Sequence, residues 1–218
     1  MNSFKYKKNH LFCEGVKVEE ICKNFSTPFY LYSSKTLINN YKLLHKMLNG
    51  INFLIAYSVK ANSNLSVLKT FAKYGAGADV VSIGELKKAL KAGIANNKIV
   101  YSGVGKSKDE IAFALKNKIE QFNVESIEEL KTIAKIAEQI NTSANIALRV
   151  NPDISAGGHP KISTGKKTDK FGIPISDAKN VYELAKKFKS LKIVGIDIHI
   201  GSQIRNLAPF KKAFKKVL

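Results

Sequence analysis

The sequence predicts an α/β fold in which a parallel β-sheet curves into a (β/α)8 barrel. Three observations lead to this prediction: apolar strand segments alternate with amphipathic helices, several strands pair a bulky face with a small or polar face, and polar residues gather at strand ends. Strands that alternate with helices must pair in parallel through crossover connections. Two architectures satisfy that requirement, an open doubly wound sheet and a closed barrel.

Six short apolar segments are expected to form the strands, at residues 53–59, 77–82, 98–101, 120–124, 146–150 and 193–200. Helices are expected before and between them, where apolar residues recur at spacings of three and four. These stripes are Leu37, Tyr41, Leu44 and Leu48, then Leu130, Ile133, Ala134 and Ala137, and finally Val181, Leu184, Ala185 and Phe188.

Boundary signals support the predicted helices. Three serines each precede a glutamate by three residues, which is the capping-box pattern. The pairs are Ser82–Glu85, Ser107–Glu110 and Ser126–Glu129. Gly75 and Gly93 follow the last apolar positions of two helices, where glycine commonly ends a helix.

The distribution of side chains over the strands favours the barrel. On residues 77–82, Asp79 shares a face with Gly77 and Val81, and on residues 146–151 Arg149 lies opposite Leu148. An open sheet covered on both sides should be apolar on both faces. A barrel with a functional mouth places bulky residues outward beneath its helices and small or polar groups inward, which is the pattern found here.

The barrel is expected to be incomplete, because closure requires eight strands and about six are present. The last segment, "FKKAFKKVL", is predicted to be a helix. We therefore expect a piece of a longer protein that is poorly folded and inactive by itself. Residues 151–175 form a long connection after a strand, and we expect this segment to be a flap over the site.

Composition excludes several classes of protein. The net charge of +19 suggests nucleic-acid binding, but only Arg149 and Arg205 among the 36 basic residues are arginines, and the lysines are spread over helix faces. No segment resembles a membrane span or a signal peptide. Cys13 and Cys22 fit neither a disulfide framework nor a zinc site, so no metal is expected and a cytoplasmic location is favoured.

Five polar residues lie at or just beyond the predicted strand ends, and in a barrel they would converge at one mouth. They are Lys60, Asp79, Arg149, His199 and Ser202. Each has an ordinary structural interpretation: Asp79 and Arg149 could form an ion pair inside the barrel, and His199 could be a core histidine. The five together indicate a functional site.

Lys60, in "YSVKAN", ends an apolar run where packing gives no reason for a lysine. If it is desolvated, its pKa should fall and its amine should become nucleophilic. Such a lysine forms a Schiff base either with a carbonyl substrate, as in an aldolase, or with pyridoxal phosphate. By contrast, "GVGKS" at 103–107 lacks the first glycine of a Walker A loop, since Val100 occupies that position, and Ser107 is interpreted as a helix cap.

Four segments resemble the PLP-dependent decarboxylases with an alanine-racemase-like barrel, and among them the diaminopimelate group. They are "YSVKAN", "GADVVSIGE", "RVNPDISAGGHPKISTGKKTDKFGI" and "HIGSQ". The resemblance runs from about Leu11 to the end of the chain. It implies that residues 1–28 belong to a second, β-rich domain, that residues 29–218 form part of a PLP-binding barrel, and that further active-site residues lie beyond Leu218.

The resemblance also implies roles for the site residues. Lys60 would hold PLP as a Schiff base and His199 would stack on its ring, so these two are the expected catalytic residues. Ser202 would bind the phosphate and Arg149 would lie near the phenolic edge of the ring. Asp79, together with Glu85, would support the lysine.

The implied reaction is the decarboxylation of meso-2,6-diaminopimelate to L-lysine and CO2, after the substrate displaces Lys60 from the Schiff base. The implied assembly is a homodimer with a shared active site. Two alternatives remain open: decarboxylation of ornithine, arginine or carboxynorspermidine on the same fold, and a non-catalytic PLP-binding homologue. Neither nucleic acid nor a membrane is an expected partner.

Overall fold

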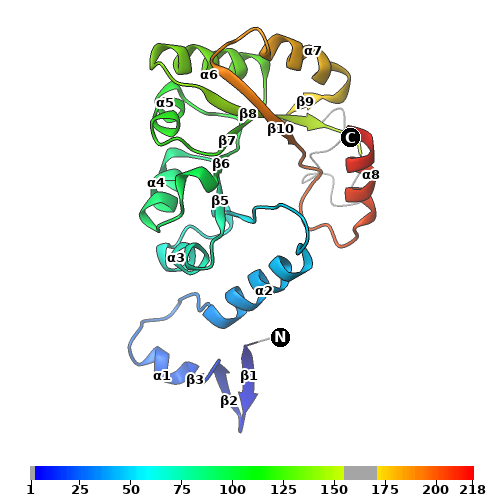
Figure 1. Ribbon diagram of the computed structural model, residues 1–218. Coiled ribbons are helices and arrows are strands. Elements are labelled where there is room, and N and C mark those ends of the chain that lie inside the picture. Colours follow the sequence, from blue (N-terminus) through cyan, green and yellow to red (C-terminus); the bar gives the residue numbers. More distant parts are fainter. Residues whose placement is uncertain (1–2, 155–170) are drawn as a thin grey trace.

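The main sheet of the computed structural model, which describes residues 3–154 and 171–218, contains six parallel strands in chain order (Figure 1). They are β4 (Ala56–Ser58), β5 (Gly77–Val80), β6 (Ile99–Tyr101), β7 (Gln121–Val124), β8 (Ala144–Asn151) and β10 (Leu191–Asp197). A two-residue strand, β9 (Ile173–Pro174), pairs with the end of β8. The strand order never reverses, as it does in a doubly wound sheet, so the prediction of a partial barrel is confirmed.

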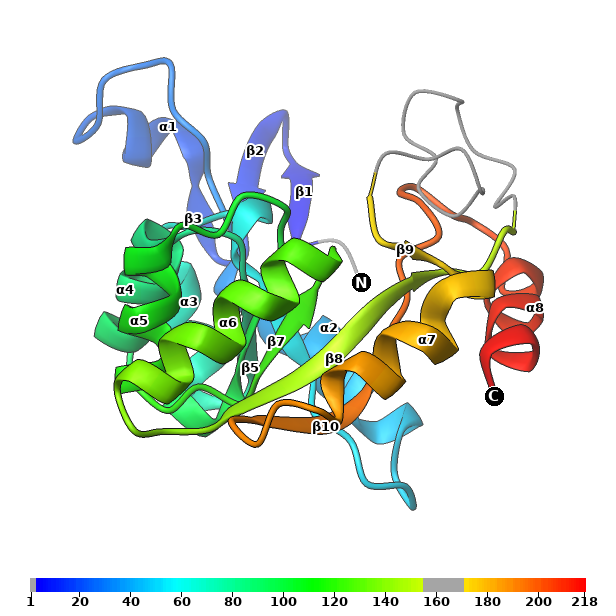
Figure 2. The same ribbon diagram turned by 90° about the horizontal axis from the view of Figure 1, so that it is seen from above.

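Five helices cover the outer face of this curved sheet, and the inner face is left open (Figures 1 and 2). They are α3 (Leu65–Lys73), α4 (Ile83–Lys91), α5 (Lys108–Lys116), α6 (Ile127–Gln139) and α7 (Ile175–Ala185). Short 3-10 turns, η1 (Val59–Ala61) and η2 (Asn96–Lys98), flank the strands. The apolar core lies between helices and sheet, and its fully buried members include Val80, Tyr101, Phe122, Ile146 and Leu148.

Helix α2 (Ser34–Met47) packs against α3 and buries less than its sequence predicts. Of the predicted stripe only Tyr41 is buried, and its ring packs 6.1 Å from that of Phe71 on α3. Leu44 is 45% exposed. The stripe was predicted correctly as helical, but of its four residues only Tyr41 is buried, where α2 meets α3. The basic helix α8 (Ala208–Val217) is also largely exposed and buries only Ala213 among the residues described.

The first residues form a separate three-stranded antiparallel sheet of β1 (Phe4–Lys7), β2 (His10–Cys13) and β3 (Val16–Lys17), followed by α1 (Val18–Cys22). Glu14 connects this sheet to α2, because its carboxylate accepts hydrogen bonds from the Ser33 hydroxyl (2.8 Å) and the Lys35 N–H (2.9 Å). These bonds lower the pKa of Glu14, the bond from the Lys35 N–H contributing most. The carboxylate thus satisfies an N–H group in the first turn of α2.

The three predicted capping pairs form in two different ways. In each pair the serine hydroxyl accepts a hydrogen bond from the glutamate N–H three residues later. Only Glu110 completes the reciprocal bond of a capping box. Glu85 and Glu129 reach one residue further back and accept from the N–H groups of Val81 and Glu125. These two bonds anchor backbone that follows β5 and β7.

The predicted glycine stops are confirmed by left-handed backbone at Gly75 (φ +83°) and Gly93 (φ +88°), after α3 and α4. Glycine adopts this conformation without the steric cost of a Cβ atom. After α5 and α6 the same conformation falls on Lys118 (φ +52°) and Asn141 (φ +51°). The helices therefore end in the same way with different residues.

Two other expectations concern the flap and a membrane span. The predicted flap, residues 151–175, lies mostly within 155–170, outside the part of the chain that the structure describes. At its ends, Asn151 completes β8 and Ile173 begins β9. None of the described helices combines the length and apolarity that crossing a bilayer requires.

Candidate active site

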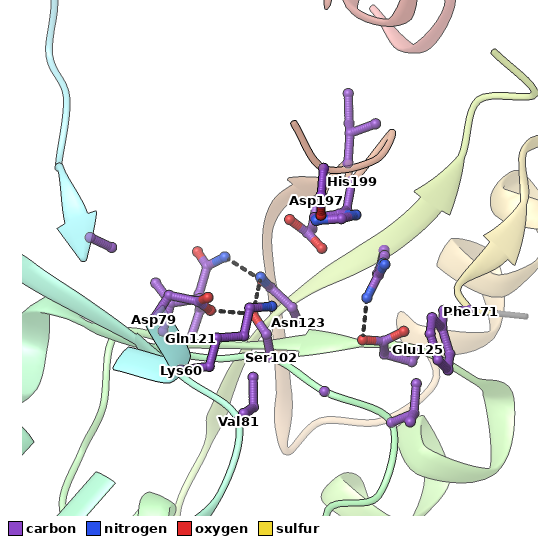
Figure 3. A pocket seen from close by; sticks show the side chains of 17 residues that line it. Lys60, Asp79, Val81, Ser102, Gln121, Asn123, Glu125, Phe171, Asp197 and His199 are labelled. Carbon is purple, nitrogen blue, oxygen red and sulfur yellow. Dashed lines mark hydrogen bonds and ion pairs between the residues drawn. The ribbon is translucent and has the colours of Figure 1, made fainter. Parts of the chain in front are cut away.

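A cavity of about 660 Å³ opens on the inner face of the sheet, at the carboxyl ends of the strands (Figure 3). All five residues predicted for the site line this cavity: Lys60, Asp79, Arg149, His199 and Ser202. They come from four different strand ends, because parallel strands present their carboxyl ends at one rim. The prediction that the five converge is confirmed.

Lys60 belongs to η1, directly after β4, and not to the strand itself. Ser58 ends the strand and points to Asp79, while Tyr57 faces outward and stacks on Phe71 at 4.3 Å. Successive residues of β4 thus face opposite sides of the sheet. The predicted desolvation of Lys60 is not seen, because the lysine lies at the open rim of the cavity and is exposed.

Asp79 receives hydrogen bonds on both carboxylate oxygens. The Ser58 hydroxyl donates to Oδ2 (3.2 Å) and the Ser102 hydroxyl donates to Oδ1 (2.5 Å). Ser102 in turn accepts from Asn123 Nδ2 (3.1 Å), and Asn123 Oδ1 accepts from Gln121 Nε2 (2.8 Å). The side chains form a continuous polar row from Ser58 on β4 to Gln121 on β7. Figure 3 shows the part of this row from Asp79 to Gln121.

Arg149 forms its ion pair with Glu125, and the possible pair with Asp79 is not formed. Arg149 Nη1 lies 2.7 Å from Glu125 Oε1, and both side chains are buried. The Arg149 guanidinium also lies 5.7 Å from the ring centre of Phe171. Arg149 and Glu125 occupy neighbouring positions on β8 and just after β7, which decides the pairing.

Two titratable residues on and after β10 are shifted by this environment. Burial raises the pKa of Asp197 to about 6, although the nearby Arg149 cation opposes the shift. Burial, followed by the positive charges of Arg149 and Lys60, lowers the pKa of His199. The imidazole is therefore largely neutral at pH 7 and can present its ring face without adding a charge.

Lys106 in the "GVGKS" segment is a structural cation below the cavity. Its side chain is 1% exposed, and Nζ donates to Gly103 O (2.7 Å), Asn123 O (2.8 Å) and Glu129 Oε1 (2.6 Å). Burial raises the pKa of Glu129, against the effect of the Lys106 charge. The rejection of a Walker A loop agrees with this geometry, since the lysine is saturated by protein oxygens.

Several cavity residues were not predicted from the sequence. They are Ser102, Gln121, Asn123, Glu125, Phe171 and Asp197. The period of two that placed Asp79 inward also places Gln121, Asn123 and Glu125 on one face, so extending it to β7 would have found them. No such pattern marks Phe171, which follows the segment outside the described residues. Glu85 does not line the cavity, because its carboxylate is used at the start of α4.

The residues present fit a pyridoxal phosphate group. The cavity lies within the size range of cofactor sites and offers an amine on Lys60, a flat ring on His199 and a hydroxyl on Ser202. Glu125 Oε2 and Arg149 Nε are buried with no hydrogen-bond partner among the described residues. Buried polar atoms normally have a hydrogen-bond partner. The Arg149 Nε–H could therefore donate to an oxygen of a bound ligand.

Comparison with known proteins agrees with this fit. The profile of the family described as pyridoxal-dependent decarboxylase, pyridoxal binding domain, matches residues 34–218. A diaminopimelate decarboxylase from Pseudomonas aeruginosa is 44% identical over 218 residues, which are all of this chain and 52% of the relative. The chain thus spans about half the length of the curated relatives it matches.

Solved structures give the same result. Diaminopimelate decarboxylase from Helicobacter pylori, complexed with L-lysine, superposes with a TM-score of 0.89 at 46% identity, over 92% of this chain and 51% of the other. Lysine decarboxylase from Selenomonas ruminantium shares the fold, with a TM-score of 0.82 over 99% of this chain and 51% of the other, at 22% identity. The chain belongs to the family of pyridoxal-dependent decarboxylases and contains its pyridoxal-binding domain.

Proposed function

We propose that this chain is the pyridoxal-binding part of an enzyme that decarboxylates meso-2,6-diaminopimelate to L-lysine and CO2. The observation that carries the proposal is that Lys60, His199 and Arg149 line one cavity in a domain of the pyridoxal-dependent decarboxylases. The substrate is supported by the identities, because the two diaminopimelate decarboxylases above are 44% and 46% identical to the chain and the lysine decarboxylase is 22% identical.

In this proposal Lys60 and His199 are the catalytic residues. Lys60 would hold pyridoxal phosphate through its amine. The neutral His199 ring would pack against the cofactor and exclude water from that face. When bound, the cofactor supplies an electron-withdrawing ring that accepts the electron pair left as CO2 departs.

The other cavity residues position the cofactor and balance its charge. Ser202, in the turn after β10, would donate its hydroxyl to the phosphate, and Arg149 would offer its Nε–H to an oxygen of the cofactor. Asp79 lines the same part of the cavity as Lys60 and would help to position its amine. Glu125 offsets the Arg149 cation, so the cavity is not left strongly positive.

Trapping the cofactor tests the assignment of Lys60. The full-length protein is treated with borohydride, and the modified peptide is located by mass spectrometry. We expect a pyridoxyl adduct at Lys60, and loss of both adduct and CO2 release in Lys60→Ala. Lys69→Ala on the exposed side of α3 is the matched control and should retain both. An adduct at another lysine in the unmodified protein would contradict the assignment.

Substrate preference is tested separately with the same protein. We expect the highest kcat/KM with meso-diaminopimelate and much lower values with ornithine, arginine, lysine and carboxynorspermidine. Preference for ornithine or arginine would keep the site and replace the substrate. A protein that forms the Lys60 adduct but releases no CO2 from any of these amino acids would be the non-catalytic homologue.

We further propose the organisation of the whole protein. Residues 1–28 belong to a second, β-rich domain and residues 29–218 to the barrel, which is supported by the separate sheet of β1 to β3. The unpaired thiols of Cys13 and Cys22 support a reducing, cytoplasmic location. A homodimer with a shared active site is proposed from the resemblance to the decarboxylase family, and sedimentation of the full-length protein at several concentrations tests it.

A further inference from the structure

The polar row on the inner face has a defined direction. Asn123 Oδ1 accepts from Gln121, which turns the Asn123 amide nitrogen toward Ser102. The Ser102 oxygen accepts from that nitrogen, and its single proton then points to Asp79. Asn123 and Ser102 each accept a hydrogen bond from the residue before them in the row and donate one to the residue after them. The row therefore runs in one direction, from Gln121 to the Asp79 carboxylate.

Asp79 is the end point of this row from both sides. Ser58 donates to one carboxylate oxygen from β4, and Ser102 donates to the other from the loop after β6. The Ser102–Asp79 separation of 2.5 Å lies in the range of hydrogen bonds from a hydroxyl to an ionised carboxylate. Among the residues that the structure describes, a hydroxyl donor faces each carboxylate oxygen, so the arrangement favours one fixed orientation of Asp79.

The buried Lys106 fixes the backbone in the middle of the row. Its ammonium group holds the Asn123 carbonyl, the Gly103 carbonyl and the Glu129 carboxylate at the same time. The backbone that carries the middle of the row is thus joined to the loop after β6 and to α6. Because Lys106 does not line the cavity, it can hold the Asn123 backbone in place whether or not the cavity is filled.

We propose that Ser102 is a positioning residue that, backed by Asn123 and Gln121, holds Asp79 as an oriented anion beside Lys60. The inference rests on the proposed function of Lys60 and adds residues to which that proposal gives no role. Figure 3 shows Lys60, Asp79 and Ser102 in the same part of the cavity. A fixed anion there holds the amine in place and favours retention of the cofactor bound to it.

The test measures retention of the cofactor, apart from turnover. Full-length holoenzyme is dialysed at pH 7.5, and the pyridoxal phosphate that remains is followed by its absorbance. Hydrogen bonds to charged groups contribute enough that Ser102→Ala should lose the cofactor roughly 10-fold faster. Asn123→Ala should have a smaller effect, because Asn123 acts on Asp79 only through Ser102. Gln121→Met should have the smallest effect, because Gln121 acts only through Asn123 and Ser102. Ser102→Thr keeps the hydroxyl and should restore retention.

Two controls separate positioning from general loss of structure. Ser63→Ala removes a half-buried serine whose hydroxyl accepts a hydrogen bond from Lys88 outside the cavity, and it should retain the cofactor as the unmodified protein does. In an Asp79→Asn background, Ser102→Ala should have less than a twofold further effect, since its target is already altered. Equal effects of Ser102→Ala with and without Asp79 would overturn the inference.

The two proposals fail differently. If borohydride traps no adduct at Lys60 in the unmodified protein, the proposed function fails. If the adduct forms at Lys60 but Ser102→Ala retains the cofactor within twofold of the unmodified protein, the function stands and the positioning role is wrong.

Discussion

Leu148 and Arg149 are neighbours on β8, yet they lie on opposite faces of the sheet and are held by different forces. Leu148 is fully buried beneath the helices, among apolar side chains. Arg149 faces the cavity and is held by Glu125 and the ring of Phe171. On the outer face, stability depends on how closely the apolar side chains pack. On the inner face, it depends on each charge and hydrogen-bond donor having a partner. Adjacent residues of one strand can therefore serve stability and chemistry separately.

Breaking the buried ion pair should have the largest effect on stability. Arg149→Met leaves the Glu125 carboxylate buried without a cation, which typically costs about 3–5 kcal/mol of unfolding free energy. Urea unfolding of the full-length protein measures the loss. The double variant Glu125→Gln/Arg149→Met removes both charges and should recover most of it. If the double variant is as unstable as the single one, charge matching does not govern the inner face.

The matching change on the outer face is Leu148→Ala. It removes buried methyl groups and leaves a cavity in the core, at a cost of about 3 kcal/mol. Unlike Arg149→Met, it should leave the rate of cofactor loss nearly unchanged, because Leu148 does not line the cavity. Urea unfolding and dialysis of the same preparation separate the two effects. A large increase in cofactor loss would show that the two faces are not independent.

The third prediction concerns pH. Burial raises the pKa of Asp197 to about 6 from its ordinary 3.8, against the effect of Arg149, while Asp79 and Glu125 reinforce it. Because ionisation is harder in the folded protein, Asp197 favours folding below pH 4, and this contribution is lost as the pH rises to about 6. Asp197→Asn lacks the titration, so relative to the unmodified protein it should gain about 2 kcal/mol between pH 4 and pH 7.

Urea unfolding at pH 4, 5, 6 and 7 measures that difference. The Ile198 N–H that bonds the Asp197 carboxylate can bond the asparagine oxygen equally, so the exchange is close to isosteric. A stability difference between the two proteins that does not change with pH would show that Asp197 titrates normally.

The smallest expected effect lies away from both faces, at the end of α5 in the outer layer. Lys118 has φ +52°, and Lys118→Gly should raise the unfolding free energy by about 0.5–1 kcal/mol, since glycine adopts this conformation without strain. Gly93→Ala at the equivalent end of α4 is the opposite change and should lower it by a similar amount. Neither Lys118→Gly nor Gly93→Ala should change the rate of cofactor loss. These two variants therefore serve as controls for the three predictions above.

Much of the fold follows from local pattern. The alternation of strands and helices, the serine caps and the stops at Gly75 and Gly93 are consequences of short-range preferences and were predicted. The inward placement of Asp79 and Arg149 follows from the period of two along a strand. The extent of burial of α2 could not be predicted, because it depends on which neighbours the helix meets.

Local sequence patterns do not predict which residues pair with each other within the site. Asp79 and Glu125 are both carboxylates on the inner face, and either is chemically able to pair with Arg149. The register of β7 and β8 places Glu125 beside Arg149 and leaves Asp79 to the serines. Likewise, whether Lys60 is desolvated depends on how far the cavity is open, which no local pattern records.

By itself, the order of residues determined the parallel α/β architecture, the inward direction of the polar groups and the rim at which they meet, because periodicity and capping act over a few residues. The carboxylate that holds Arg149, the donors that orient Asp79 and the burial of Lys106 are set only by the folded structure. Those choices depend on strand register and on contacts between residues far apart in the chain, where small differences in distance decide between chemically equivalent partners.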